Sequence, residues 1–278
     1  MSRSNPNDGA EKPLNPANPF FIQWDSDNKQ FKYYDKETKA NVAIALPFSF
    51  LVLDTLATIK GWSNEADSGI WSNEVKNIKT DSLTVMTKKG VEVKGIYEQI
   101  KGKVSGSKYC QSVYIAFMHN KKLTMGNIQM QGAALGSWIE FCSPDKKSGN
   151  TRPNLLTGAV TVKSTEQGKV GKIVFNKPVF TYVKDVPETV QKQTIELDAE
   201  LQAYLTEYFS YIKNFESKET VPQESFTLPV SNVQNWQEKG LDAKSEAAKA
   251  TRSNQASQFE DTVTPVFNMD DDSSGLPF

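Results

Sequence analysis

The sequence predicts a mainly β fold, a compact barrel of about five or six strands with added helices. Short runs rich in aromatic and β-branched residues alternate with turns that carry Gly, Asn or Asp, as is typical of all-β domains. Only one segment has strong helical periodicity, and no internal repeat occurs. These features together favour a β-barrel over a helical or α/β domain.

The first half of the chain supplies the hairpins of this prediction. Two short aromatic runs, 20–24 and 31–34, flank a polar Asp/Ser/Asn turn and predict a β-hairpin. Lys88-Lys89-Gly90 separates two β-branched runs and predicts a second one. In 108–118 the residues alternate with period two, which predicts a strand with Val113, Ile115 and Phe117 on one face.

The second half supplies the helices. Apolar residues recur at helical spacing over 123–141, although three glycines weaken this prediction. Two strands are expected near 157–163 and 170–183, with a turn in "STEQGK" between them. The segment 187–215 carries an apolar stripe from Leu197 to Ile212 and predicts the best helix in the chain.

Composition divides the chain into four parts. Hydrophobic residues make up 38% of the chain, a low share that suggests a folded body with polar segments around it. We expect a disordered segment over 1–18, a folded body over 19–215, a flexible linker over 216–268 and an acidic tip over 269–278.

The charge follows the same division. Residues 1–215 hold 27 Lys and Arg against 22 Asp and Glu, whereas residues 216–278 hold 5 against 11. The net charge of −1 therefore hides a basic body and an acidic tail. This asymmetry raises nucleic acid as a partner.

Several function classes lack support in the sequence. Two cysteines, Cys110 and Cys142, and the single His119 cannot supply a usual zinc site or a disulfide framework. No phosphate-loop or catalytic-triad pattern occurs, so we expect no enzyme activity and no cofactor or metal. The N-terminal stretch has no apolar signal region, and no apolar run spans a membrane, so a cytoplasmic location is expected.

Binding residues, in contrast, are abundant. Eight lysines and only two acids lie between residues 88 and 122, interleaved with tyrosines. Lysines neutralise phosphates, and aromatic faces stack on unpaired bases at roughly 1–3 kcal/mol each. Two further groups of aromatic residues lie around the first hairpin and around the loop 61–69. The candidate contacts for single-stranded nucleic acid are Trp24, Lys32, Tyr34, Trp62, Trp71, Lys88, Lys89, Lys94, Tyr97, Lys101, Lys103, Lys108 and Tyr114.

These candidates also have a purely structural interpretation. Lysines on outward strand faces keep a sheet soluble, and alternating aromatics usually form a core. Along 31–34 we expect at least one exposed aromatic residue, because Phe31 and Tyr33 face one way while Lys32 and Tyr34 face the other. The acids Asp25, Asp27, Asp35 and Glu37 are better explained as hairpin-turn residues than as metal ligands.

The sequence "NMDDDSSGLPF" at 268–278 adds a resemblance. It resembles the C-terminal tip of bacterial single-stranded DNA-binding proteins, in which an acidic cluster precedes a terminal Pro-Phe after a long linker. Asp270, Asp271 and Asp272 match the acidic run, and Pro277 and Phe278 match its end; Leu276 lies in a longer spacer than is usual. The layout is also similar to that of phage-encoded proteins of this type.

The resemblance implies an elaborated OB-fold-like β-barrel that coats single-stranded DNA in replication, recombination or repair. It implies that the tip, through Asp270, Asp271, Asp272, Leu276, Pro277 and Phe278, binds partners such as a polymerase, primase, helicase or nuclease. Three alternatives remain: a protein-binding adaptor with a docking tail, a strand-annealing or RNA-binding protein, and a metal-dependent nuclease built on Asp25, Asp27 and Asp35. A homo-oligomer is possible.

Overall fold

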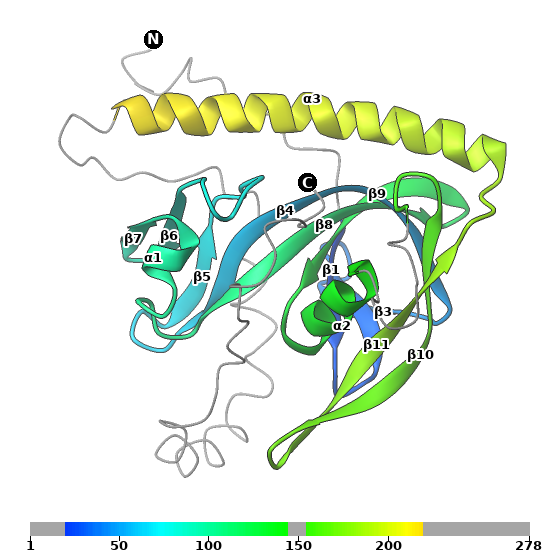
Figure 1. The fold of residues 1–278 in the computed structure, drawn as a ribbon, viewed down its shortest axis with the longest axis horizontal. Helices are drawn as coiled ribbons and strands as arrows, with labels where there is room; N and C mark the ends of the chain where they lie inside the picture. Colours follow the sequence, from blue (N-terminus) through cyan, green and yellow to red (C-terminus); the bar gives the residue numbers. More distant parts are fainter. Residues whose placement is uncertain (1–19, 144–153, 219–278) are drawn as a thin grey trace. The chain divides into compact units, whose positions relative to one another are not determined.

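The computed structural model describes residues 20–143 and 154–218, with side chains as far as Lys213. The chain divides after Ser231, and every described residue belongs to the first part. Strands dominate the described residues, and three helices accompany them. The prediction of a mainly β fold with added helices is therefore confirmed (Figure 1).

The described residues form eleven strands, where the sequence suggested five or six. The strands are β1 (Phe20–Asp25), β2 (Gln30–Asp35), β3 (Ala40–Ile44), β4 (Phe48–Ser63), β5 (Ser68–Ser72), β6 (Leu83–Thr87), β7 (Gly90–Gly95), β8 (Ser107–His119), β9 (Lys122–Met130), β10 (Ala159–Val170) and β11 (Ile173–Val183). The helices are α1 (Tyr97–Ile100), α2 (Gly132–Cys142) and α3 (Glu188–Lys218).

All eleven strands belong to one mixed sheet, and nine of them follow the order β3-β2-β1-β9-β8-β4-β5-β6-β7. The long strands β4 and β8 run antiparallel through its centre, and β1 pairs with β9 in parallel. Strand β10 pairs with the first residues of β4, and β11 pairs with β10. No pairing among the described strands joins β3 to β7, so the sheet is open.

A Greek key lies within this sheet. Strands β4, β8 and β9 follow one another antiparallel, and the chain then returns through α2 so that β10 lies beside β4. The spatial order β10-β4-β8-β9 is the arrangement that defines a Greek key. Strand β1 occupies the free edge of β9, and its turn reaches β11 through hydrogen bonds between Ser26 and Asn176.

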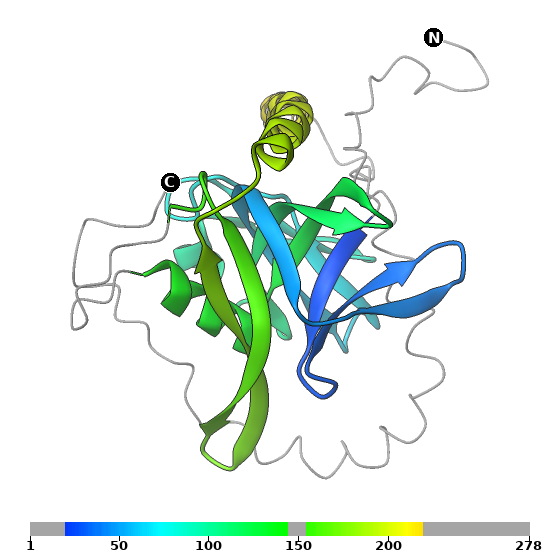
Figure 2. The same cartoon turned by 90° about the vertical axis from the view of Figure 1, so that its right-hand side faces the viewer.

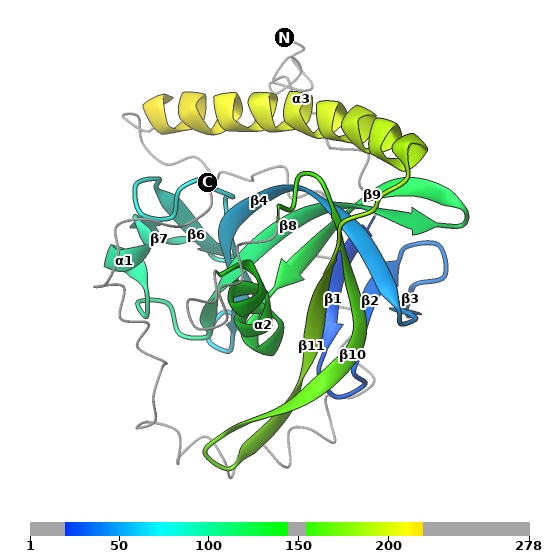
Figure 3. The same cartoon turned by 45° about the vertical axis from the view of Figure 1, so that its right-hand side comes forward.

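The largest core fills the space that these strands enclose. Alternate residues of β4, β8 and β9 point inward, among them Phe50, Ile115 and Ile128, each at most 1% exposed. Helix α2 packs beside the β10–β11 hairpin (Figure 3). It contributes Trp138, whose ring packs edge-on against that of Phe180, with 5.2 Å between the ring centroids. The predicted inward face of 108–118 is thereby confirmed.

Helix α3 covers the opposite face of the same central strands. Leu201 and Leu205 of α3 are buried against Leu53 and Leu56 of β4 and Met125 of β9. Figure 2 shows the helix nearly end-on, lying across the strands. The periodicity that predicted a helix over 187–215 is confirmed, and its apolar stripe explains this packing.

Two local predictions are wrong. The stretch 123–141 was expected to be helical, but Lys122–Met130 is strand β9 and only Gly132–Cys142 is helix. Pairing with β8 decides the structure of this stretch, because the spacing of its apolar residues fits the period of a strand as well as that of a helix. The turn expected at 164–169 is part of β10, and the chain reverses at Gly171, where φ is +58°. No described helix is long and apolar enough to cross a membrane.

Candidate nucleic-acid interface

A lobe is formed by the stretch of chain that follows β4 and precedes β8. It consists of the strands β5, β6 and β7 and the helix α1. One face of this lobe has its own core, which includes Ile59, Ile70, Leu83, Val85 and Ile100. Because successive side chains of a strand point to opposite faces, the residues that alternate with these lie on the other face. That second face carries the candidate site.

Register brings three candidate residues into one row. Lys60 of β4 lies opposite Lys108 of β8 on one side and opposite Trp71 of β5 on the other. Directly opposed residues share a face, with Cβ atoms about 4.5–5.5 Å apart. Trp62 follows Lys60 by two residues and therefore projects from the same face. We call Lys60, Trp62, Trp71 and Lys108 the Lys–Trp row.

Two glycines hold the end of this row together. A Cβ on Gly61 would lie 2.1 Å from the carbonyl oxygen of Gly106, and a Cβ on Gly106 would lie 2.0 Å from the carbonyl oxygen of Trp62. Gly106 also has a φ of +82°, which favours glycine. The close backbone approach fixes the start of β8 against the end of β4, and hence Lys108 beside Lys60.

The two lysines of the row are not neutralised by their neighbours. Neither Lys60 nor Lys108 forms an ion pair with any side chain in the described part of the chain. Lys108 is exposed and Lys60 is half-buried. Like charges directly opposite each other on a sheet are destabilising. An anion placed over this row would relieve that repulsion.

The two tryptophans add apolar surface beside these charges. Both Trp62 and Trp71 are half-buried, so each residue retains some accessible surface. The indole nitrogen of Trp71 is itself buried and has no hydrogen-bond partner among the described residues. A row of two cations and two large aromatic rings offers phosphate contacts and stacking platforms within one small area.

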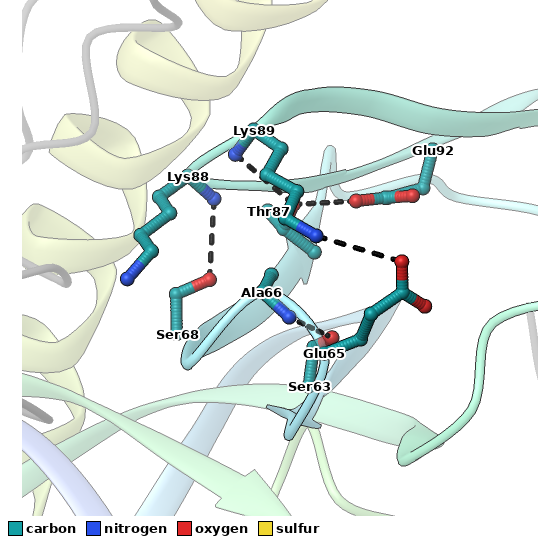
Figure 4. Close-up of polar contacts among 8 residues, drawn as sticks. All are labelled: Ser63, Glu65, Ala66, Ser68, Thr87, Lys88, Lys89 and Glu92. Carbon is teal, nitrogen blue, oxygen red and sulfur yellow. Dashed lines mark hydrogen bonds and ion pairs between the residues drawn. The ribbon is translucent and has the colours of Figure 1, made fainter.

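The predicted residues Lys88 and Lys89 lie beside the row, on the turn between β6 and β7. Figure 4 shows that this turn meets the turn between β4 and β5. The backbone N–H of Lys88 donates to Ser68, its ammonium group donates to the carbonyl of Asp67, and the ammonium of Lys89 lies 3.5 Å from the Glu65 carboxylate. These lysines therefore tie two turns together, although both remain exposed.

The other candidates of this lobe differ in availability. Lys94 on β7 and Lys103 after α1 are exposed. Lys101 forms an ion pair with Glu98. Tyr97 is half-buried and packs against Tyr109, with ring centroids 5.5 Å apart, as part of the core of the lobe.

The candidates of the first hairpin lie on β1 and β2, which β9 and β8 separate from β4. Lys32 forms an ion pair of 2.8 Å with Asp25, and Trp24 donates to the carbonyl of Asn176. Burial raises the pKa of Asp25, but hydrogen bonds from Lys32 and Asn28 outweigh burial and lower this pKa to about 2. The structure does not bring this group together with the Lys–Trp row.

The expectation of an exposed aromatic residue along 31–34 is wrong. Phe31, Tyr33 and Tyr34 are all buried, the last two at 9% exposure. Strand β2 packs between β1 and β3, and both of its faces are covered at these positions. Asp25 and Asp35 accept hydrogen bonds from the backbone of the turns that follow them, as expected for hairpin acids.

Tyr114 is buried beneath α3. Its hydroxyl donates to Glu74 across 2.8 Å, Ser112 donates to the same carboxylate, and the backbone N–H of Glu74 donates to Tyr208 of the helix. Burial, with the nearby Glu74 carboxylate, raises the pKa of Tyr114 well above its usual value. In this arrangement the Tyr114 ring has no open face on which a base could stack.

Sequence reasoning missed Lys60. It lies in "LATIKGW", where the alternation with Trp62 places the two residues on one face, but its pairing with Lys108 is visible only in the register. No cluster of three or more potential His, Cys, Asp or Glu metal ligands occurs within the described ranges. The residues predicted to bind partners, Asp270, Asp271, Asp272, Leu276, Pro277 and Phe278, lie outside the described ranges.

Comparisons with known proteins give no relative. No protein-family model, no curated protein and no solved structure matches this chain.

Proposed function

We propose that this chain is a non-catalytic protein that binds single-stranded DNA, and that its body is an elaborated OB-type barrel. The observation that carries the proposal is the Lys–Trp row, in which two lysines without ion-pair partners in the described residues lie beside two half-buried tryptophans. Such pairing of cations with accessible rings is what a strand with free bases requires.

The strand order supports the OB-type assignment. An OB fold is a five-stranded, partly open Greek-key barrel. In this assignment β4, β8, β9, β10 and β11 would take the five strand positions, and α2 would lie between the third and the fourth. The chain departs from the simple fold in two ways: the lobe of residues 64–106 is inserted between the first two strands, and β1 lies against the third.

Oligonucleotides bind OB folds on the face of strands two and three and on the adjoining loops, of which one joins strands one and two. In this chain α3 covers much of the first surface. Two carboxylates lie beneath the helix: that of Asp54 accepts a hydrogen bond from Gln202 of α3, and that of Glu74 accepts from Ser112 and Tyr114 of β8. Carboxylates repel phosphates. The inserted lobe corresponds to the loop between strands one and two, and the Lys–Trp row lies where this lobe joins β4 and β8, with Trp71 inside the lobe. We therefore assign the DNA path to this lobe.

In its proposed role the protein coats single strands exposed during replication, recombination or repair. Lysines would hold the phosphates while bases stack on Trp62 and Trp71, so binding would tolerate many sequences. The segment from Asp270 to Phe278 would recruit other proteins, because an acidic run followed by apolar residues suits a hydrophobic pocket with a basic rim.

Fluorescence anisotropy with labelled oligo-dT and with a duplex of equal length, across a salt series, tests this function. We expect a strong preference for the single strand and a linear fall of log K with log salt, because lysine–phosphate contacts release counterions. Tighter binding of oligo-U than of oligo-dT would instead favour an RNA-binding role. Failure to bind either DNA at low salt would overturn the proposal and favour a protein-binding adaptor.

A further inference from the structure

We propose that two copies of this chain associate through the free edge of β3, so that the sheets of both continue into one another. The inference does not depend on the proposed DNA binding. It rests on a contrast among the three edges of the sheet, which belong to β3, β7 and β11.

Two of these edges carry features that prevent pairing with another strand. Strand β7 has the charged residues Glu92 and Lys94, and a bulge interrupts its ladder with β6. Strand β11 contains Pro178 and Lys177. Charged side chains, proline and bulges are the usual means by which proteins keep an edge from associating.

The β3 edge has none of these features. Its register with β2 runs without a shift from Ala40 to Ile44, and no charged residue occurs from Ala40 to Leu53. Strand β2 is the only described strand that pairs with β3. Its outward backbone N–H and C=O groups are thus a template for another strand.

The neighbouring side chains indicate that the occupant is apolar. Val42 and Ile44 are half-buried against the rim of the largest core, while Asn41 and Ala43 are exposed on the other face. A strand added at this edge would complete the burial of Val42 and Ile44. A second copy of β3 offers the same side chains on the same face without any charge to be buried.

Geometry restricts how two such strands can pair. A two-fold axis perpendicular to the sheet keeps the core face of one copy beside the core face of the other, so only registers that match faces are allowed. The register centred on the strand places Val42 opposite Val42 of the second copy. Asn41 of each copy then lies opposite Ala43 of the other. Since this ladder is short, we expect a weak, concentration-dependent dimer.

The register allows two double variants with opposite expected effects on the dimer. In Asn41→Lys/Ala43→Lys the two-fold axis places lysines opposite each other twice, and like charges directly opposite destabilise a sheet. In Asn41→Lys/Ala43→Glu the same axis places Lys opposite Glu twice. Both pairs of substitutions lie at exposed positions, so neither removes a core side chain. Val91→Lys on β7, also at an exposed position, is the matched control on another edge.

Sedimentation equilibrium of the full chain over a wide concentration range gives the test. We expect the wild type and Val91→Lys to approach twice the mass of one chain at high concentration. The double-lysine variant should remain at the mass of one chain, and the Lys/Glu variant should again reach twice that mass. Circular dichroism checks that all variants fold.

Three outcomes would overturn the inference. A wild-type chain that keeps the mass of one copy throughout would show that β3 does not pair with itself. A double-lysine variant that still doubles its mass would assign the dimer to another surface. A Lys/Glu variant that stays at the mass of one copy would contradict the proposed register. Because the readout is mass without DNA, none of these results bears on DNA binding.

Discussion

The strands β4 and β8 lie side by side over almost their full length, yet their two halves have opposite character. In the middle, beneath α3, Asp54 lies opposite Tyr114, and Glu74 accepts hydrogen bonds from Ser112 and Tyr114. Near the end of β4 the same ladder brings Lys60 opposite Lys108. In the covered half Asp54, Ser112 and Tyr114 have hydrogen-bond partners within the protein, whereas the Lys–Trp row leaves its cations without ion-pair partners among the described residues.

This difference shows how one ladder can serve two purposes. Packing by Leu201 and Leu205 makes the covered half part of the stable body. The row instead retains two like charges side by side, an arrangement that lowers stability and that an anionic ligand would favour. Substitutions in the covered half should therefore change stability without changing binding, and the main effect of those in the row should be on binding.

The largest effect is expected from Leu205→Ala, which empties a site that is 1% exposed beneath α3. Loss of a buried leucine side chain typically costs about 2–5 kcal/mol of unfolding free energy. Urea denaturation measures it, and Ile195→Ala, at a position 68% exposed on the same helix, is the matched control. If both variants unfold at the same urea concentration, α3 does not stabilise the body.

The second prediction concerns the charges of the row. Lys60→Glu/Lys108→Glu should weaken oligo-dT binding by roughly 100-fold at low salt and flatten the salt dependence, because two phosphate contacts are replaced by repulsion. Anisotropy titration measures both. The control is Lys36→Glu/Lys184→Glu, which makes the same charge change at exposed positions outside the row. Equal losses in the two variants would mean that net charge, and not the row, governs binding.

Tyr114→Phe gives the third prediction. It removes the hydroxyl that donates to Glu74 but keeps the ring. A hydrogen bond to a charged group contributes about 1.5–3 kcal/mol, so the unfolding free energy should fall by that order while oligo-dT affinity stays unchanged. Tyr182→Phe, which deletes a hydroxyl at a partly exposed position, is the matched control. A marked loss of affinity in Tyr114→Phe would place the DNA path beneath α3 instead.

The smallest effect is expected from Trp62→Ala. If one base stacks on this ring, its loss should weaken binding by about 1–3 kcal/mol without changing the salt dependence, since no charge is removed. Trp24→Ala, in the first hairpin, should leave affinity unchanged in a folded protein. Quenching of tryptophan fluorescence by oligo-dT should be weaker in Trp62→Ala than in Trp24→Ala, because Trp62→Ala removes one of the two rings of the row and leaves Trp71. The reverse pattern would contradict the proposed site.

The sequence predicts more of the fold than of the site. Period-two alternation identifies β8 with its inward face, and the stripe from Leu197 to Ile212 identifies α3, because both patterns are set by local geometry. The helix prediction for 123–141 is wrong over 123–130, because the pairing of these residues with β8 is not encoded locally. The inserted lobe and the parallel pairing of β1 with β9 depend on partners far along the chain.

The site was predictable in composition but not in arrangement. The lysines and tryptophans are evident in the sequence, yet only register separates Lys108, which lies beside Lys60, from Lys32, which is neutralised by Asp25. Burial likewise removes Tyr34 and Tyr114 from the candidate contacts. Whether an aromatic residue belongs to the core or can stack on a base depends on what covers it. Here α3 covers Tyr114, and Tyr34 is buried by the surroundings of β2.

The parallel pairing of β1 with β9 also has a consequence in time. During synthesis β1, β2 and β3 leave the ribosome first, but the residue that pairs with Phe20 is Gly126. At about 5–20 residues per second, the chain needs several seconds to add that partner. The hydrogen bond from Trp24 to Asn176, 152 residues away, is completed later still. During that interval neither β1 nor β3 has a partner strand at its outer edge. Nascent copies translated from one messenger RNA lie close to one another at the same time.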